Sequence, residues 1–190
     1  MRAACRLIAG TRRPLTAVAV DGAGGAGKST LAGAICAALR ETLQEIAIVR
    51  VDDFYRPLHD DVRAALDAEH GYRNYFDWMR LRDRALIPLR GGRAASYQRY
   101  DWTTGELGDR VTVKPAPVVL IEGVYSSRPE LRPLLDLAIF VDTPRDLRMR
   151  RMSARGQNAS DWIARWMAAE DWYLEHIRPA DHADLVVRGF

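Results

Sequence analysis

The chain carries one glycine-rich segment, GAGGAGKS at residues 22–29, that limits the folds open to it. This segment fits the pattern G-x-x-x-x-G-K-[ST], which marks a loop that wraps around phosphate groups. Its Lys28 is one of only two lysines in a chain of 190 residues that otherwise uses arginine for positive charge. We infer that an ammonium group is needed at this point of the molecule.

The residues on either side supply the context that such a loop requires. Residues 15–21 form a short apolar run that is typical of a buried strand. In residues 30–39, Leu31, Ile35 and Leu39 recur at helical spacing among many alanines. A flexible turn between strand and helix is the alternative, and the order strand, glycine loop, helix favours the phosphate-binding interpretation.

The chemistry of the loop follows from its residue types. Glycines let backbone N–H groups surround phosphate oxygens, and the helix that begins here adds the positive end of its dipole. Lys28 can reach the β- and γ-phosphates, and the Ser29 hydroxyl can ligate Mg²⁺. The expected phosphate-binding residues are Gly22, Ala23, Gly24, Gly25, Ala26, Gly27, Lys28, Ser29 and Thr30.

The composition indicates a globular chain, and we expect residues 1–190 to form a single domain. The chain is 48% hydrophobic and 28% charged, and its net charge of +3 is too balanced to indicate nucleic-acid binding.

Cys36 falls on the apolar side of the helix after the loop, which favours a buried free thiol. The apolar run 7–9 is too short for a signal peptide, and none is long enough to span a bilayer. We therefore expect a cytoplasmic protein without membrane contact; association into a homo-oligomer stays open.

Apolar runs alternate with helical patterns along most of the chain, which predicts a parallel sheet covered by helices on both faces. The expected fold is a three-layer α/β sandwich, and its ligands would bind at the carboxyl ends of the strands, where Asp21, Asp52 and Glu122 fall. The predicted strands are 17–21, 46–51, 118–121, 137–141 and 184–187, and the predicted helices are 28–42, 129–135, 146–155 and 161–176.

Residues from about 58 to 115 interrupt this alternation. We interpret them as a small helical and β-hairpin insertion over the strand ends, where an acceptor pocket would lie. The insertion is predicted to hold a helix at 77–89, a break at Gly91-Gly92, and strands at 95–102 and 111–113 joined by a turn at 103–109.

Two acidic elements follow predicted strands. Asp52 and Asp53 would repel each other beside a phosphate loop unless they share a cation or a proton, and one of them could accept the proton of an attacking hydroxyl group. An N-cap or Asx turn is the alternative. Glu122 ends an apolar strand, which is the position of a carboxylate that holds Mg²⁺; it could equally cap the next element.

Arginines crowd the segment 145–158, which we expect to form a lid. Arg148, Arg151 and Arg155 are spaced i, i+3, i+7 and so share one helical face. This face could close on a transferring phosphoryl group and stabilise its charge, with Arg148 and Arg151 as catalytic residues. A solvated stripe on the surface is the alternative.

Aromatic residues gather near the C-terminus. Trp162, Trp166, Trp172 and Tyr173 could stack on nucleic-acid bases. Their helical spacing and the acids between them, such as Glu170, favour a packed helix instead. We therefore expect no nucleic-acid partner.

The motifs, taken in their order along the chain, resemble those of the uridine kinase family of P-loop kinases. They also resemble the motifs of the wider group that includes phosphoribulokinase, pantothenate kinase and nicotinamide riboside kinase. The resemblance spans residues 18–189, and the set DDFY, FD, YDW and IEG is more specific than the loop alone. The matching segments are GAGGAGKS (22–29), VDDFYRP (51–57), NYFDW (74–78), YQRYDWTTGE (97–106), VLIEGVY (119–125) and FVDTPRDLRMRR (140–151).

The resemblance implies a P-loop NTPase fold and ATP- and Mg²⁺-dependent phosphorylation of a hydroxyl group on a small molecule. It implies that Asp52 is the base. It also implies that the acceptor is contacted by Asp52, Tyr55, Asp77 and Tyr100, and that Asp77 binds sugar hydroxyls. It also implies that the arginine-rich segment is a lid over the phosphates.

The chain departs from the uridine-specific members of the family, which carry a pyrimidine-contacting histidine shortly after Y-D-F. Residues 102–106 (WTTGE) contain no histidine. The expected acceptor is a nucleoside or similar ribosyl compound, with nicotinamide riboside, pantothenate or a sugar as alternatives. An ATP-hydrolysing regulatory protein is a further alternative; a GTPase is not, because the lysines, 28 and 114, leave no Asn-Lys-x-Asp element.

Overall fold

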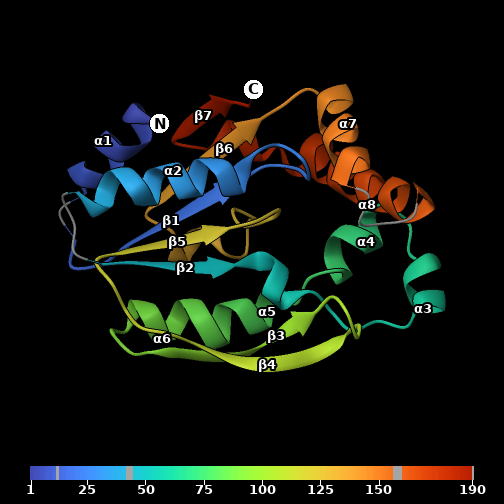
Figure 1. Cartoon of the computed structure of the whole chain (residues 1–190), viewed down its shortest axis with the longest axis horizontal. Helices are drawn as coiled ribbons and strands as arrows, with labels where there is room; N and C mark the ends of the chain where they lie inside the picture. Colours follow the sequence, from blue (N-terminus) through green and yellow to red (C-terminus); the bar gives the residue numbers. More distant parts are fainter. Residues whose placement is uncertain (12, 42–44, 156–159, 190) are drawn as a thin grey trace.

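The centre of the molecule is a five-stranded parallel sheet, as the sequence predicts (Figure 1). The computed structural model describes residues 1–11, 13–41, 45–155 and 160–189. Neighbouring strands are, in order, β2 (Ile46–Arg50), β5 (Val118–Glu122), β1 (Thr16–Asp21), β6 (Leu137–Asp142) and β7 (Leu185–Arg188). All of them run in the same direction, so their carboxyl ends meet at one edge of the sheet.

Both faces of the sheet are covered, which explains why the residues inside its central strands are apolar. Every residue of β1 and β5 is buried. Side chains alternate between two cores: Val18 and Leu120 pack on one face, whereas Ala17 and Ile121 pack on the other.

Helices α1 (Arg2–Gly10) and α2 (Lys28–Arg40) cover the first face. Helix α2 buries Ile35 and Leu39 against the sheet, together with Cys36, which is a free thiol as expected. The helix ends at Arg40 rather than at residue 42, which lies outside the described part of the chain. Helix α1 was not predicted, although its buried Ala4 and Ile8 are spaced i, i+4; Ile8 packs in the same core as α2.

A helix built from three pieces covers the second face. It comprises α5 (Trp78–Leu81), a π-helical turn (Arg82–Leu86) and α6 (Ile87–Arg90), which confirms the helix predicted at 77–89. The wide turn lies just before Pro88, whose ring would collide with a carbonyl of a regular α-helix. Leu86 and Leu89 pack into the core of this face.

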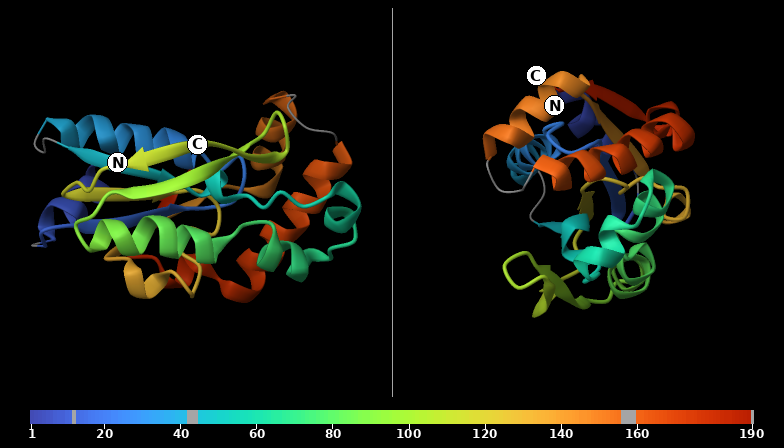
Figure 2. Two further views of the ribbon diagram at one scale, coloured as in Figure 1. Left: turned by 90° about the horizontal axis from the view of Figure 1, so that it is seen from below. Right: turned by 90° about the vertical axis from the view of Figure 1, so that its right-hand side faces the viewer.

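The predicted hairpin is present, with a shorter turn than expected. Strands β3 (Ala95–Asp101) and β4 (Glu106–Val113) pair antiparallel and lie beside the α5–α6 helix near the β2 edge (Figures 1 and 2). The expected turn at 103–109 is wrong because Gly105, with φ of 76°, reverses the chain and β4 begins at the next residue.

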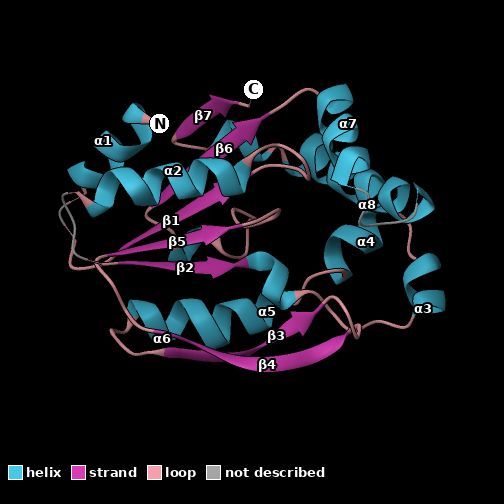
Figure 3. Ribbon diagram, in the orientation of Figure 1, coloured by secondary structure: helices cyan, strands magenta, loops and turns pink. Residues whose placement is uncertain are grey.

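Four helices gather beyond the carboxyl ends of the strands, at the right of Figure 3: α3 (Asp60–Ala64), α4 (Ala68–Asn74), α7 (Arg145–Arg155) and α8 (Ser160–Trp172). Helix α8 continues into a π-helical turn, Tyr173–Ile177, in place of one regular helix to residue 176. The helix predicted at 129–135 is wrong: only a 3₁₀ turn, Arg132–Leu134, forms there. Pro133 lacks the N–H that an α-helix would bond to the carbonyl of residue 129, and its ring would collide with that carbonyl.

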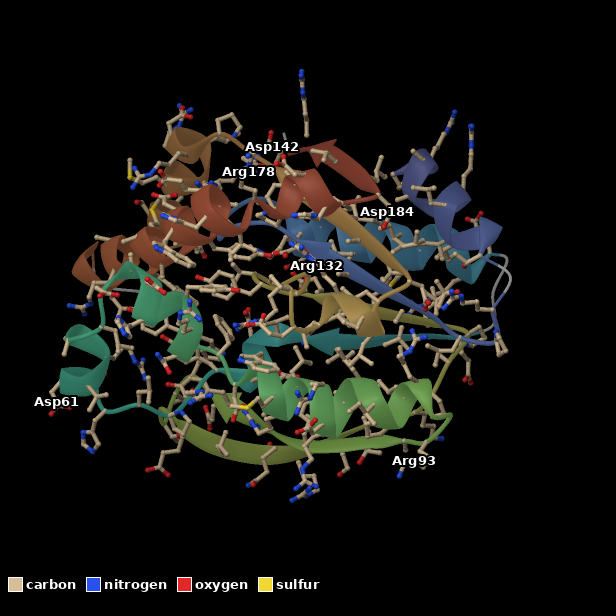
Figure 4. The ribbon with its side chains drawn as sticks, turned by 180° about the vertical axis from the view of Figure 1, so that it is seen from behind. Asp61, Arg93, Arg132, Asp142, Arg178 and Asp184 are labelled. Atoms are coloured by element: carbon tan, nitrogen blue, oxygen red, sulfur yellow. The ribbon has the colours of Figure 1, made fainter. Side chains whose placement is uncertain are left out.

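Charged side chains point outward from the molecule, as the rear view shows (Figure 4). Asp61 on α3 and Arg93 after α6 point away from the molecule at its periphery.

Together, the sheet, its covering helices and the hairpin make the architecture the expected α/β sandwich with a small hairpin. Within the described residues, no helix combines the length and apolar character needed to cross a bilayer.

Candidate active site

The glycine-rich loop connects β1 to α2 at the carboxyl edge of the sheet, as predicted. Gly25 and Gly27 adopt positive φ angles of 74° and 100°. A Cβ atom at Gly25 would approach the backbone oxygen of Arg148 to 2.7 Å, so the loop packs directly on the backbone of α7. Glycine is therefore required at this position both for backbone geometry and for close approach.

A cavity of about 560 Å³ opens beside the loop. It lies where the loop, the ends of β2 and β5, the hairpin tip, and helices α7 and α8 meet. Its lining residues are Gly24, Gly25, Gly27, Lys28, Ser29, Thr30, Asp52, Trp102, Thr103, Glu122, Val124, Met152, Ile163, Trp166 and Glu170. The structure thus brings most of the predicted loop residues together with two of the predicted acids.

Ser29 and Glu122 meet at the floor of this cavity. The Ser29 hydroxyl donates a hydrogen bond of 3.0 Å to Oε1 of Glu122. No group of three or more His, Cys, Asp or Glu suited to a metal occurs among the residues that the structure describes. One hydroxyl and one carboxylate fit Mg²⁺, which is usually held by one or two carboxylates, substrate phosphates and water.

Lys28 extends over the loop into the same cavity. Its ammonium group donates a hydrogen bond of 3.0 Å to the backbone oxygen of Ala23. The side chain is only partly buried, so the ammonium group is accessible to an anion in the cavity.

The adjacent acids Asp52 and Asp53 point to different surroundings. They lie in a short 3₁₀ helix, Val51–Phe54, that follows β2. Asp52 lines the cavity, whereas Asp53 accepts a hydrogen bond of 3.2 Å from the Tyr97 hydroxyl. The two carboxylates therefore face different surroundings: Asp52 faces the cavity and Asp53 faces the Tyr97 hydroxyl.

The surroundings of Asp52 raise its pKa to about 6. The main cause is the protein packed around the cavity floor, which removes much of the water that would solvate the charge, although the side chain still faces the open cavity. Glu122 and Asp53 raise the pKa further by repulsion, and Lys28 lowers it. A carboxylate with this pKa can both accept a proton and remain mostly charged near neutral pH.

The lid arginines contact the loop and its neighbours. Arg148 is only 4% exposed, which excludes a solvated stripe for this residue. Its Nε donates to the Thr143 backbone oxygen at 3.2 Å, and its Nη2 donates to Asp171 at 3.3 Å. Arg151 donates to the backbone oxygen of Gly25 at 3.1 Å. The side chain of Arg155 lies outside the described residues.

Three residues that were predicted to bind the phosphoryl acceptor lie outside the cavity lining. Asp77 caps α5 by accepting the Arg80 N–H at 3.0 Å. Tyr55 and Tyr100 are buried against each other with ring centroids 5.1 Å apart. Both rings pack against Trp102, which does line the cavity, so they support its wall from behind.

Two aromatic residues that line the cavity wall, Trp102 and Trp166, were not predicted as site residues. Trp102 stands at the hairpin tip with 47% of its surface exposed, and its ring centroid lies 5.8 Å from that of Trp166 on α8. The helical spacing of Trp162 and Trp166 indicated packing, which is correct for both, but not that Trp166 also reaches the cavity.

Glu170 is another residue that the sequence did not assign to the site. It is 1% exposed, lines the cavity, and accepts the Gly24 N–H at 2.9 Å. Its sequence position on a helix far from the loop carried no signal for this contact.

Asp21, the third acid at a strand end, has a structural role. Its fully buried carboxylate accepts five hydrogen bonds and does not line the cavity. The donors are the backbone N–H groups of Gly22, Tyr125 and Ser127 and the hydroxyls of Ser127 and Tyr173. This carboxylate ties the start of the loop to the segment after β5 and to the C-terminal region.

We expect Asp21→Asn to lower the free energy of unfolding by about 3 kcal/mol, because its amide would present donors to donors in a buried network. Tyr173→Phe removes a single donor and should cost about 1 kcal/mol. Urea denaturation followed by circular dichroism measures both changes. An Asn variant as stable as the parent protein would show that this network does not hold the loop.

Comparison with known proteins gives matches over nearly the whole chain. The profile described as the phosphoribulokinase / uridine kinase family matches residues 17–189. A uridine kinase from Limosilactobacillus reuteri (strain DSM 20016) is 30% identical over 188 residues, covering 93% of this chain and 84% of the relative. A uridine kinase from Borrelia duttonii (strain Ly) is 27% identical over 179 residues, covering 90% and 84%.

A similar fold is found in a solved structure described as a possible uridine kinase from Bacillus stearothermophilus. The TM-score is 0.77 at 24% sequence identity, and the match covers 97% of this chain and 95% of that chain. Sequence and fold comparisons therefore agree over almost the same residues.

Proposed function

The chain belongs to the phosphoribulokinase / uridine kinase family of kinases, and we propose that it transfers the γ-phosphoryl group of ATP to a hydroxyl group of a nucleoside or a similar ribosyl compound. One observation carries this proposal: a single cavity contains the phosphate-binding loop, Lys28, the Ser29–Glu122 pair and the Asp52 carboxylate. A phosphate donor and an alcohol could thus meet in line between the loop and the base.

Each group in this cavity has a role in the proposed reaction. The backbone N–H groups of the loop and the Lys28 ammonium bind the β- and γ-phosphates. Ser29 and Glu122 would hold Mg²⁺, which neutralises phosphate charge when bound. Asp52 accepts the proton of the acceptor hydroxyl as the new O–P bond forms and the bond to ADP breaks. Arg151 lies outside the cavity lining and donates to the Gly25 backbone oxygen; in the proposed reaction it would stabilise the charge on the phosphoryl group.

The walls of the cavity support a flat acceptor group that carries no negative charge. Trp102 and Trp166 offer aromatic surface, with Val124, Met152 and Ile163 as apolar neighbours. Lys28, which the phosphates would engage, is the sole cation among the described residues of the lining. An acceptor with its own carboxylate or phosphate, such as pantothenate, would find no separate counter-ion there, whereas a nucleobase could stack.

Measurement of ADP release over a panel of alcohols tests the proposal. We expect nucleosides or a ribosyl pyridine to stimulate ADP formation at least about tenfold, and Trp102→Ala to raise the acceptor KM about tenfold while changing kcat less. Trp102→Phe keeps an aromatic surface and serves as the matched control. If ADP release were the same with every alcohol and with none, an ATP-hydrolysing regulatory protein would be the better description.

A further inference from the structure

Glu170 places a buried negative charge against a loop built to bind negative charge. It belongs to α8, far from the loop in sequence, and it is not needed for the proton transfer assigned to Asp52 or for the metal pair. Burial of an ionised carboxylate is unfavourable unless donors and cations compensate it. The groups that compensate Glu170 therefore indicate what it does.

The compensating groups are those that a phosphate would also use. Gly24 donates its backbone N–H to Oε2 of Glu170 at 2.9 Å, and Arg148 Nη1 lies 3.6 Å from the same oxygen. A Cβ atom built on Gly24 would meet the two carboxylate oxygens at 3.0 and 3.4 Å, so the carboxylate covers this part of the loop. Both groups are anion binders: one is a loop amide and the other a guanidinium.

We propose that Glu170 is a positioning residue that competes with nucleotide phosphates for the Gly24 amide and for Arg148. This inference rests on the proposed function and concerns how nucleotide binding at that site is controlled. Phosphates that enter the cavity approach Glu170 as like charges, and their binding moves its carboxylate away from the loop. Arg148 loses one of its counter-ions in the same step and becomes available to the phosphates.

Two further features of these side chains agree with such an exchange. Nη1 of Arg148 is buried and makes no hydrogen bond, so it has a donor to offer to a phosphate oxygen. Burial raises the pKa of Glu170, with opposing effects from Lys28, the Gly24 N–H and Arg148. Its charge is thus already disfavoured, and an incoming anion disfavours it further. Asp171 also pairs with Arg148, at 3.3 Å, but this carboxylate is partly exposed and pairs with Arg145 rather than with the loop.

The variant Glu170→Gln isolates the charge, because glutamine keeps an oxygen that can accept the Gly24 N–H. We expect calorimetric titration to show ADP binding roughly tenfold tighter in this variant than in the parent protein. Binding of adenosine, which carries no phosphate, should stay unchanged. Asp171→Asn removes a second carboxylate from Arg148 and is the matched control; its ADP affinity should change by less than about twofold.

Other results would overturn the inference. These are an ADP affinity in Glu170→Gln equal to or weaker than that of the parent protein, an equal gain for adenosine, or an equal gain in Asp171→Asn. If Glu170→Gln does not fold, Glu170→Asp, which keeps the charge but reaches less far toward Gly24, should still tighten ADP binding and is tested in the same way. Absence of ADP binding by parent and variant alike would reject the proposed function itself, and this outcome is distinct from equal binding by both.

Discussion

Replacing Lys28 with alanine is expected to lower kcat about 10³-fold with little effect on the fold. The ammonium group is the single cation among the described cavity-lining residues, and it is placed to meet the charge that develops on the transferred phosphoryl group. Removing one such donor typically costs 10² to 10³ in rate. Steady-state ADP production measures the loss.

The fold should tolerate this change because the Lys28 ammonium makes one hydrogen bond, to the Ala23 backbone oxygen. Thermal denaturation should therefore give nearly the same Tm for variant and parent. Lys114, the other lysine, is exposed beyond β4, and Lys114→Ala is the matched control with unchanged kcat. A Lys28→Ala protein with normal turnover would remove the proposed mechanism.

Asp52→Asn should lower kcat about 10²- to 10⁴-fold, which is the usual contribution of a general base. Asparagine keeps the shape of the side chain but cannot accept the hydroxyl proton. The neighbouring Asp53→Asn gives a sharp control, because Asp53 lies against Tyr97 and does not line the cavity. We expect Asp53→Asn to retain kcat within about tenfold, and equal losses in both variants would contradict the assignment of the base.

The raised pKa of Asp52 predicts a particular pH dependence. The base must be deprotonated, so kcat/KM should fall about tenfold per pH unit below a pH of about 6. If the base were an ordinary aspartate with a pKa of 3.8, kcat/KM would start to fall at a pH about two units lower. The acid limb of the profile should vanish in Asp52→Asn; a limb that persists in that variant would belong to another group.

The fold was predictable because its signals are local. Continuous apolar runs identify strands buried on both faces, and GAGGAGKS identifies the turn between β1 and α2. The local signals failed where tertiary context decides. Helix α1 was not predicted, and its Ile8 packs in the same core as Ile35 of α2. The helix expected at 129–135 does not form because Pro133 lacks the N–H donor that the interior of the helix needs.

The sequence by itself determined which residue types can do chemistry here: the loop with Lys28 and Ser29, the acid at the end of β5, and an acidic pair after β2. Only the tertiary structure decided how they are used. It turns Asp52 into the cavity and Asp53 toward Tyr97. It also brings Glu170 and Trp166 of α8 against segments more than 60 residues away in the chain, Gly24 and Trp102. Strand and loop patterns depend on neighbours in sequence, whereas the partner of a side chain across the cavity depends on how distant segments pack, which no local pattern records.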